Sequence, residues 1–387
     1  MKRSLALACA AVALTGGSAF AQSKFDVTIG GDVFFQYGFV DQNQDAGLRS
    51  TEMRNRFRFV LTPSAKADNG LEYGARLRVR ADTSNAGAGN NSTNVNRLLN
   101  QDRAFIFAKG GFGTVQAGTI NGLSDEYGFI GPNVEGISGS ADNTDVDFLA
   151  GSPLYESAPG EADRVLARST NFRNLASGNA ATRIVYLTPT IAGFQGGVSY
   201  MPRSDDSQNS IRRTKFDGAF EDVVEVGGIY LREIGPVALE ASAYYEFGDT
   251  QRTSDTGPEL KNLSSYNIAA NVGFADFKVG AMYRNAGESG YVKGAIGDAA
   301  DQETWIVGAN YTLGPVIFAA NYQYYKDAGD PIVAGNSKVD LYQAGITYTV
   351  APGLTTGLEY SYFKARENEV ALRDKGSIIL LDTRVAF

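Results

Sequence analysis

Apolar and polar residues alternate one by one along most of this chain, as they do in β-strands whose two faces meet different surroundings. In the stretch FDVTIGGDVFFQYGFV, Val33, Phe35 and Tyr37 share one face, and Asp32 and Gln36 share the other. Comparable segments recur as far as the C-terminus, and counting them predicts 16 strands. The sequence therefore predicts an all-β fold.

The connections between these segments alternate between short turns and longer polar loops. Short turns such as Ala275-Asp276 and Gly314-Pro315 are followed by long loops, the longest being residues 121–164. Short periplasmic turns and longer outer loops are typical of membrane barrels, and ~16 strands leave an aqueous channel. No run of 18 apolar residues follows Ala21, so no transmembrane helix is expected. We therefore predict a 16-stranded antiparallel transmembrane β-barrel with both termini on the periplasmic side.

One predicted hairpin, residues 52–82, is unusually basic. It carries six arginines at alternate positions of its two strands: Arg54, Arg56, Arg58, Arg76, Arg78 and Arg80. Apolar residues such as Phe57 and Leu77 occupy the intervening positions. In a membrane barrel the apolar face meets lipid and the charged face meets water, so these arginines are candidates for a basic wall that lines the pore.

The N-terminus has the features of a secretory signal peptide. Met1-Lys2-Arg3 is basic, a short apolar run follows, and Ala19-Phe20-Ala21 is a small-residue cleavage site. The predicted organisation is a signal peptide over residues 1–21 and one barrel domain over residues 22–387. Cys9 is the one cysteine of the chain and lies in the signal peptide, so no disulfide is expected.

Composition excludes several classes of function. The chain has no histidine, which removes Ser-His and Cys-His nucleophiles and histidine metal ligands. Taking Lys2 and Arg3 from 35 basic residues leaves 33 against 43 acidic ones, a balance that argues against nucleic-acid binding. Residues 142–147 (DNTDVD) offer oxygens at calcium-like spacing but lack the EF-hand glycine and closing glutamate. We predict no metal or cofactor, with Ca²⁺ in the long loop as the one alternative.

Four segments together resemble a known family: RNRFRFVLTP, DRAFIFAKGGFGTVQAGT, TIAGFQGGVSY and the terminal TRVAF. The chain resembles the 16-stranded trimeric general diffusion porins of Gram-negative proteobacteria. That resemblance implies a passive, non-enzymatic channel for small hydrophilic solutes and ions in the cell outer membrane. It also implies a homotrimer, contact with outer-membrane lipid and lipopolysaccharide, and recognition of Phe387 by the barrel-assembly machinery.

In that family the third outer loop folds into the lumen and faces a basic wall. Here the resemblance assigns this role to residues 121–164, which follow the fifth strand. The candidate constriction acids of this loop are Asp125, Glu126, Glu135, Asp142, Asp145 and Asp147. The implied mechanism is size exclusion combined with a transverse electric field.

Two alternatives remain open at this point. The arginines could form a binding ladder in a solute-specific, anion-binding porin. The barrel could instead be a closed adhesin or structural protein. Single-channel conductance distinguishes these classes.

Overall fold

A computed structural model of the chain describes residues 25–45, 47–82, 99–129, 145–155, 164–170, 172–178, 180–204, 211, 213–252, 259–294, 301–329, 333–368 and 372–387. The predicted signal peptide, residues 1–21, lies outside the described residues, as do the loop acids Glu135 and Asp142. The statements below concern the described residues.

Sixteen strands account for most of the described chain. They are β1 (Asp26–Gln42), β2 (Thr51–Lys66), β3 (Glu72–Asp82), β4 (Leu99–Gly110), β5 (Gly113–Ile120), β6 (Ala181–Leu187), β7 (Phe194–Arg203), β8 (Phe220–Ile234), β9 (Val237–Thr250), β10 (Leu263–Phe274), β11 (Phe277–Gly287), β12 (Gln302–Leu313), β13 (Val316–Asp327), β14 (Ser337–Ala351), β15 (Leu354–Glu367) and β16 (Leu372–Ala386).

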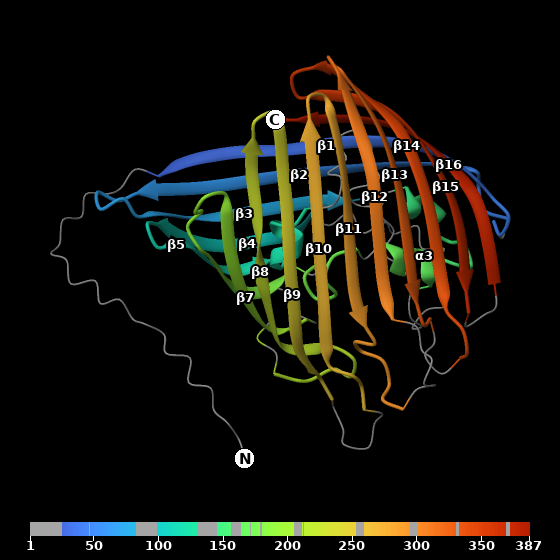
Figure 1. Cartoon of the computed structure of the whole chain (residues 1–387), viewed down its shortest axis with the longest axis horizontal. Coiled ribbons are helices and arrows are strands. Elements are labelled where there is room, and N and C mark those ends of the chain that lie inside the picture. The colour runs from blue at the N-terminus through green and yellow to red at the C-terminus, as the bar shows by residue number, and fades with distance from the viewer. Residues whose placement is uncertain are drawn as a thin grey trace.

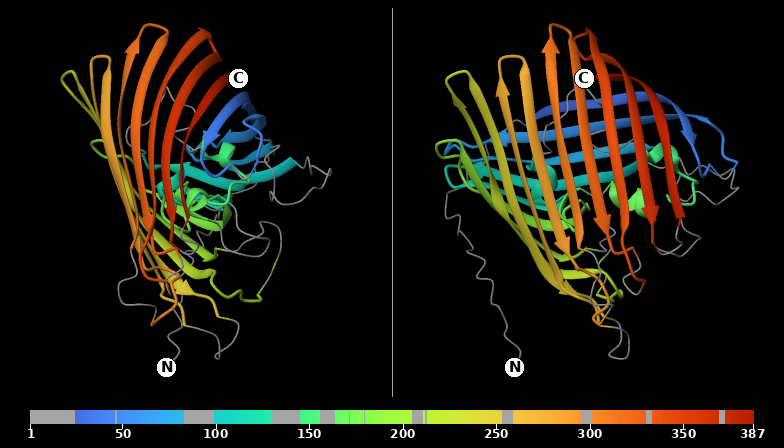
Figure 2. Two further views of the ribbon diagram at one scale, coloured as in Figure 1. Left: turned by 90° about the vertical axis from the view of Figure 1, so that its right-hand side faces the viewer. Right: turned by 45° about the vertical axis from the view of Figure 1, so that its right-hand side comes forward.

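Each strand pairs antiparallel with its neighbours in sequence, and β1 pairs with β16, so the sheet is a closed barrel. The strands are long and strongly inclined, and Figure 1 shows β1–β4 crossing behind the strands of the C-terminal half. Figure 2 shows the same wall from two other sides. The prediction of a 16-stranded antiparallel barrel is confirmed.

The alternation in the sequence separates an apolar outside from a polar inside. On β1, Phe35, Tyr37 and Phe39 are exposed, whereas Asp32 and Gln36, at positions of the opposite parity, are buried. The same holds on most of the other strands, where exposed large apolar side chains occupy one parity. Such an apolar outer band is the surface that a membrane barrel presents to lipid.

Between β5 and β6 lies a long connection, residues 121–180, and its described part contains three short helical pieces. They are α1 (Leu123–Glu126), the 3₁₀ helix η1 (Val146–Leu149) and α3 (Val165–Ser169). The predicted loop, 121–164, ends too early, because residues 165–169 form a helix and the alternating pattern resumes only at Ala181. No helix in the described part of the chain is long and apolar enough to span a membrane.

The connection touches well-separated parts of the wall. Helix α1 contacts β7, β8 and β9, η1 contacts β1, and α3 contacts β14 and β15. An apolar cluster fixes the second half, since Leu149, Val165 and Leu166 pack with Leu341 and Phe363 of the wall. Burying such side chains contributes roughly 1.5–3 kcal/mol each, so this part of the connection is packed like a protein core.

The barrel closes where the last residue meets β1. The amide of Phe387 donates to the carbonyl of Gly31 at 3.0 Å, and the Gly31 amide donates back to Phe387 at 2.9 Å. A Cβ on Gly31 would lie 2.2 Å from the carbonyl oxygen of Arg58 and 3.0 Å from the Phe387 ring. Glycine is therefore required here by close approach of backbone and ring.

We expect Gly31→Val to weaken closure of the barrel, at a cost of roughly 1–3 kcal/mol or more from overpacking. The measurement is the yield of the heat-modifiable folded band after refolding in detergent. Gly111→Val is the matched control, because a Cβ at that position has nothing within 4 Å. Equal folded yields for the two variants would show that the contact of Gly31 with Arg58 does not limit closure.

Candidate functional site

The six predicted arginines lie on one face of the β2–β3 hairpin. Arg58 stands opposite Arg80, and Arg78 stands opposite Val60, so even-numbered residues of both strands share a face. Arg56 on this face is 8% exposed, whereas its neighbour Phe57 on the other face is 40% exposed. Since the exposed apolar parity is the outer one, the arginines point into the barrel.

Two carboxylates from the neighbouring strands form ion pairs with arginines of this basic wall. Asp32 of β1 accepts from Arg58 at 2.5 Å and from Arg56 at 3.5 Å, and lies 3.4 Å from Arg384. Asp102 of β4 accepts two bonds from Arg78, at 2.7 Å and 2.8 Å. Charge-assisted, bidentate pairs of this kind hold a guanidinium in one orientation. The wall thus alternates in sign, although cations remain in excess.

A β-bulge brings Asp102 to this wall. The register of β3 with β4 shifts between Arg78 and Val79, because Arg78 pairs with Arg103 and Val79 pairs with Gln101. The extra residue, Asp102, is left without a partner in the ladder, and its side chain joins Arg78. Bulges re-aim side chains in this way, and simple alternation cannot predict them.

The long connection supplies further carboxylates to the same region. Asp147 lies 2.5 Å from Arg54 and also accepts from the Tyr155 hydroxyl at 2.9 Å. Glu126 forms an ion pair with Arg103. Asp125 lies 3.5 Å from Arg103 and also pairs with Arg173. Three of the predicted loop acids therefore contact guanidiniums, but Asp125 and Glu126 do so through arginines outside the predicted six.

Asp145 lies in different surroundings from Asp147. It is 1% exposed, accepts from Gln343 of β14 at 3.0 Å, and accepts from Ser361 of β15. Burial raises the pKa of the Asp145 carboxyl above its ordinary value, against the opposing effect of these hydrogen bonds. A solute cannot reach this carboxyl, so Asp145 attaches the connection to the wall.

Inward-facing acids of the wall also hold the start of the connection. Glu225 of β8 accepts from the backbone amides of Leu123 and Ser124 at 2.5 Å and 3.1 Å. The same carboxylate accepts from Asn174 at 3.0 Å and from Ser177 at 3.2 Å. One buried side chain thus fixes the first turn of α1 and the residues that precede β6.

The other end is held by Arg168 of α3. It donates to Asp327 of β13 at 2.6 Å and lies 3.2 Å from Glu367 of β15. Burial alone lowers the pKa of Arg168, but the two carboxylates outweigh it and raise the pKa above the ordinary arginine value. The guanidinium is therefore permanently charged and anchors α3 between two strands.

The predicted calcium alternative receives no support from the two acids that are described. Asp145 and Asp147 point to different partners, and Asp142 lies outside the described residues. Within the described ranges, no three carboxylate, cysteine or histidine groups lie close enough together to hold a metal ion.

Comparison with known proteins identifies the family to which this closed barrel belongs. The sequence model of the Gram-negative porin family matches residues 8–368. The chain belongs to the Gram-negative porin family. This porin is accordingly an outer-membrane diffusion channel.

Solved porin structures share the fold of this porin. A loop-deletion variant of OmpT, an outer membrane protein of Vibrio cholerae, is 13% identical, with a TM-score of 0.59 over 94% of this chain and 99% of that one. A variant of the Rh. blastica porin is 17% identical, with a TM-score of 0.53 over 94% of this chain and all of that one. At these identities the likeness concerns the fold.

Similarity in sequence extends to proteins of Rickettsia. An uncharacterized protein of Rickettsia bellii is 22% identical over 429 residues, covering 95% of this porin and 94% of that protein. A second one, from Rickettsia conorii, is also 22% identical, over 430 residues. The alignments run through almost the whole of each chain.

Several residues of the site were not predicted from the sequence. Arg103, Arg168 and Arg173 form ion pairs with acids, and Glu225 and Glu367 hold the connection. A signal for Glu225 and Glu367 does exist, since both occupy the inward parity of their strands, away from the basic hairpin. Their partners lie 102 and 202 residues away in sequence, so no local pattern reveals the contact.

Proposed function

We propose that this porin is a general diffusion channel for small hydrophilic solutes and ions, narrowed by the connection 121–180. The observation that carries the proposal is the attachment of that connection to opposite parts of the wall. Glu225 of β8 holds its start, and Asp327 and Glu367 of β13 and β15 hold α3. A segment that is fixed at such separated strands crosses the interior of the barrel. It therefore reduces the cross-sectional area that is open to solutes.

The proposed mechanism is size exclusion combined with a transverse field. Arg76 and Arg80 are accessible from the interior, and the loop carboxylate of Asp147 stays 35% exposed beside Arg54. Charges of opposite sign facing each other across a narrow aqueous passage orient dipolar solutes and weakly sort ions. No chemical step is involved, and we propose no enzymatic activity, because the sequence has no histidine to activate a nucleophile.

The pairing of the arginines favours a general channel over an anion-specific one. Asp32 forms ion pairs with Arg56 and Arg58. Asp102 forms ion pairs with Arg78 and, at 3.7 Å, with Arg80. A ladder for anions needs guanidiniums whose donors are unoccupied. We therefore expect permeation to follow solute size, with mild ion selectivity.

Planar-bilayer recording tests this function. We expect stepwise ohmic conductance in KCl, proportional to the bulk conductivity of the salt, with little block by millimolar phosphate. Saturating conductance and block by phosphate would favour the anion-specific alternative. Insertion without any conductance would favour a closed structural barrel.

We also propose how the chain is exported and assembled. The basic start, apolar run and A-x-A site support cleavage after Ala21, which N-terminal sequencing of the outer-membrane form tests. The terminal Phe387, which pairs with β1, is proposed as the recognition element for the barrel-assembly machinery. Deleting Phe387 should lower the folded form without reducing export, and an unchanged folded yield would refute that role.

The proposed assembly is a homotrimer in contact with outer-membrane lipid and lipopolysaccharide. Supporting the trimer, one similar structure is the in-vitro folded OmpT of Vibrio cholerae in its trimer form, 12% identical with a TM-score of 0.58. Light scattering of the detergent-purified protein, corrected for bound detergent, gives the number of chains. A mass of one chain at all concentrations would exclude a stable trimer.

A further inference from the structure

Arg76 differs from the other five arginines of the β2–β3 hairpin in having no charged partner. The other five all form ion pairs with the carboxylates described above. No hydrogen bond or ion pair joins Arg76 to any residue that the structure describes, and its side chain is exposed on the inner face of β3. Its guanidinium therefore presents a full set of N–H donors to the water and solutes inside the barrel.

Aromatic side chains of the neighbouring strand flank this guanidinium. On β4, Phe105 stands directly opposite Arg76, and Phe107 stands opposite Gly74. A Cβ on Gly74 would lie 2.8 Å from the Cζ atom of Phe107, so the Phe107 ring lies over the glycine. Successive residues on one face of a strand are ~7 Å apart, which places this ring beside Arg76 along β3.

The two phenylalanine rings point into the barrel. Ile106, which lies between them in sequence, is 65% exposed on the outer face. Phe105 is buried in an apolar cluster with Leu123 of α1. Phe107 and Tyr127 pack against the same cluster but are only partly buried. The cluster thus leaves two aromatic surfaces accessible near Arg76.

Tyr127 approaches Arg76 from the connection. Its hydroxyl donates to Gln116 of β5 at 2.8 Å. Burial, followed by the charge of Glu126, raises the pKa of the Tyr127 hydroxyl to about 12, while the Gln116 hydrogen bond and the charge of Arg76 oppose that rise. This electrostatic effect shows that the guanidinium lies near the Tyr127 ring. An unpaired cation and two aromatic surfaces therefore meet at one place inside the barrel.

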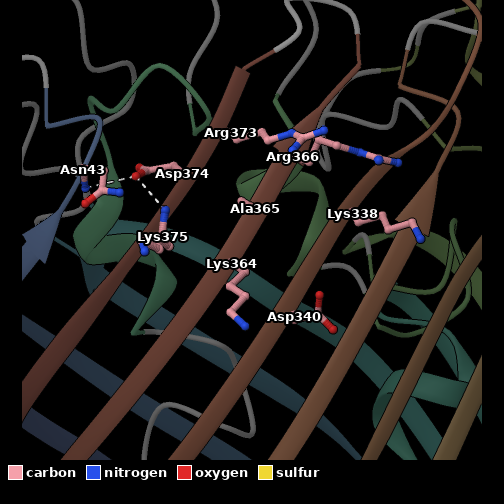
Figure 3. Close-up of a pocket in the computed structure, with 9 residues that line it drawn as sticks. All are labelled: Asn43, Lys338, Asp340, Lys364, Ala365, Arg366, Arg373, Asp374 and Lys375. Carbon is pink, nitrogen blue, oxygen red and sulfur yellow. Dashed lines mark hydrogen bonds between the residues drawn. The ribbon is translucent and has the colours of Figure 1, made fainter.

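Cations also gather on the outer surface, but they do not face the interior. Figure 3 shows a hollow at the loop ends of β14–β16 that is lined by five cations, among them Lys364. Lys364 shares its face of β15 with Leu358 and Tyr360, which are exposed on the outside of the barrel. A solute inside the barrel therefore meets Arg76 and not this hollow.

We propose that Arg76, Phe107 and Tyr127 form a weak binding site inside the channel for small organic anions that carry a carboxylate on an aromatic body. The proposal rests on the proposed channel function and names one class of solute that the channel retains briefly. The carboxylate accepts parallel hydrogen bonds from the planar guanidinium. The ring of the solute packs against Phe107 or Tyr127 in an offset or edge-to-face arrangement.

An aromatic carboxylate uses both parts of this site, whereas simpler solutes use only one. An inorganic anion contacts the guanidinium alone, and a single pair of charges gains little free energy in water. A neutral aromatic solute contacts the rings alone. One unpaired guanidinium is not a ladder, so the site agrees with a general channel, and weak binding leaves the solute free to depart.

The test is single-channel recording in KCl with benzoate, acetate or benzamide as the added solute. Benzoate should interrupt the current at millimolar concentration. Acetate, which lacks the ring, and benzamide, which lacks the charge, should each need roughly 10-fold more. Arg76→Gln should raise the half-blocking concentration of benzoate roughly 10–100-fold, because it removes hydrogen bonds between two charged groups.

Two further variants separate the ring from the charge. Phe107→Leu should bring the half-blocking concentration of benzoate close to that of acetate. Lys278→Gln is the charge-matched control, because Lys278 shares the inner face of β11 with Met282 and forms an ion pair with Glu240. This control should be blocked by benzoate like the unmodified chain.

The outcomes distinguish this site from the channel itself. Equal half-blocking concentrations of benzoate and acetate would overturn the site, as would unchanged benzoate block in Arg76→Gln. Block by phosphate at the same concentration as benzoate would identify an inorganic-anion site and would also overturn it. If Phe107→Leu fails to fold, the three solutes on the unmodified chain still decide. If the barrel inserts without conducting, the proposed function fails, whereas saturation-transfer NMR of benzoate with the unmodified chain and Arg76→Gln still tests the site.

Discussion

Replacing Arg168 by alanine is expected to release α3 from the barrel wall and to increase single-channel conductance. Arg168 joins α3 to two acids that are almost completely buried, Asp327 with its side chain 4% exposed and Glu367 with 0%. Removing one partner of a buried ion pair costs roughly 3–5 kcal/mol, because the remaining carboxylates lose their compensating charge. This cost disappears when α3 leaves the wall, because water can then hydrate both carboxylates.

Single-channel recording of Arg168→Ala should therefore show larger and noisier steps than the unmodified chain. Arg49→Ala provides the control, since Arg49 also forms an ion pair, with Glu52, but the two side chains are 80% and 57% exposed. Exposed pairs contribute only about 0–1 kcal/mol, so this variant should conduct normally. Steps of unchanged size in Arg168→Ala would mean that α3 is held by its apolar contacts alone or does not restrict the channel.

Reversing the charge of Arg76 and Arg80 is expected to give the largest change in ion selectivity. Arg76 is exposed to the interior, and Arg80 is 36% exposed beside Asp102, whereas Arg56 is largely enclosed. Two Arg→Glu changes alter the charge of this wall by four units. The two positions are four residues apart on β3, roughly 13 Å at ~3.4 Å per residue. Because this exceeds the Debye length of ~8 Å, each change acts on the stretch of the passage nearest to it. The K⁺/Cl⁻ permeability ratio should rise by about fivefold, because charges that line a narrow passage create potentials of several kT in it.

The measurement is the reversal potential across a KCl gradient, at low and at high salt. The shift should shrink at high salt because screening shortens the range of the wall charges. Arg232→Glu is the control, since Arg232 lies on the outward face of β8 beside Tyr230. An unchanged reversal potential in the double variant would show that the β2–β3 hairpin does not line the conduction path.

Asp147→Asn and Asp145→Asn separate the two acids that the sequence grouped together. Asp147 faces Arg54, so loss of its charge should move selectivity towards anions. Asp145 is buried, and its raised pKa shows that folding disfavours its ionised form. Since a raised folded-state pKa removes stability as the pH rises through it, Asp145→Asn should keep selectivity and lose no stability at neutral pH.

The barrel could be predicted from the sequence because alternation and turn spacing are local properties. The β2–β3 hairpin shows this well, since the register places Arg58 opposite Arg80 as simple alternation requires. The bulge at Asp102 was not predictable from the sequence. One extra residue shifts which side chains face inward, but it leaves no mark in the composition of the strand. The end of the long connection was missed because Val165 and Leu166 lie in a helix that packs against Leu341 and Phe363 of the wall, and not in a strand.

The interior contacts depend on parts of the chain that are far apart. The run Ile378–Leu381 is apolar on both faces, and Ile378 indeed packs inward against the connection. Continuous apolar runs indicate burial on both faces, so this signal was present in the sequence. In contrast, the hydrogen bond of Gln343 to Asp145 joins residues 198 positions apart, and only the closed barrel brings them together.

The central claim is that ions pass along the arginine face of the β2–β3 hairpin inside the barrel. Neighbouring cysteine substitutions, Arg76→Cys and Leu77→Cys, test it most directly, because the chain has one cysteine, Cys9, in the predicted signal peptide. A negatively charged, membrane-impermeant methanethiosulfonate reagent is added during single-channel recording in dilute KCl. We predict an abrupt conductance change for Arg76→Cys and none for Leu77→Cys, which faces the opposite side of β3. No response at residue 76, or a response at residue 77 alone, would contradict the claim.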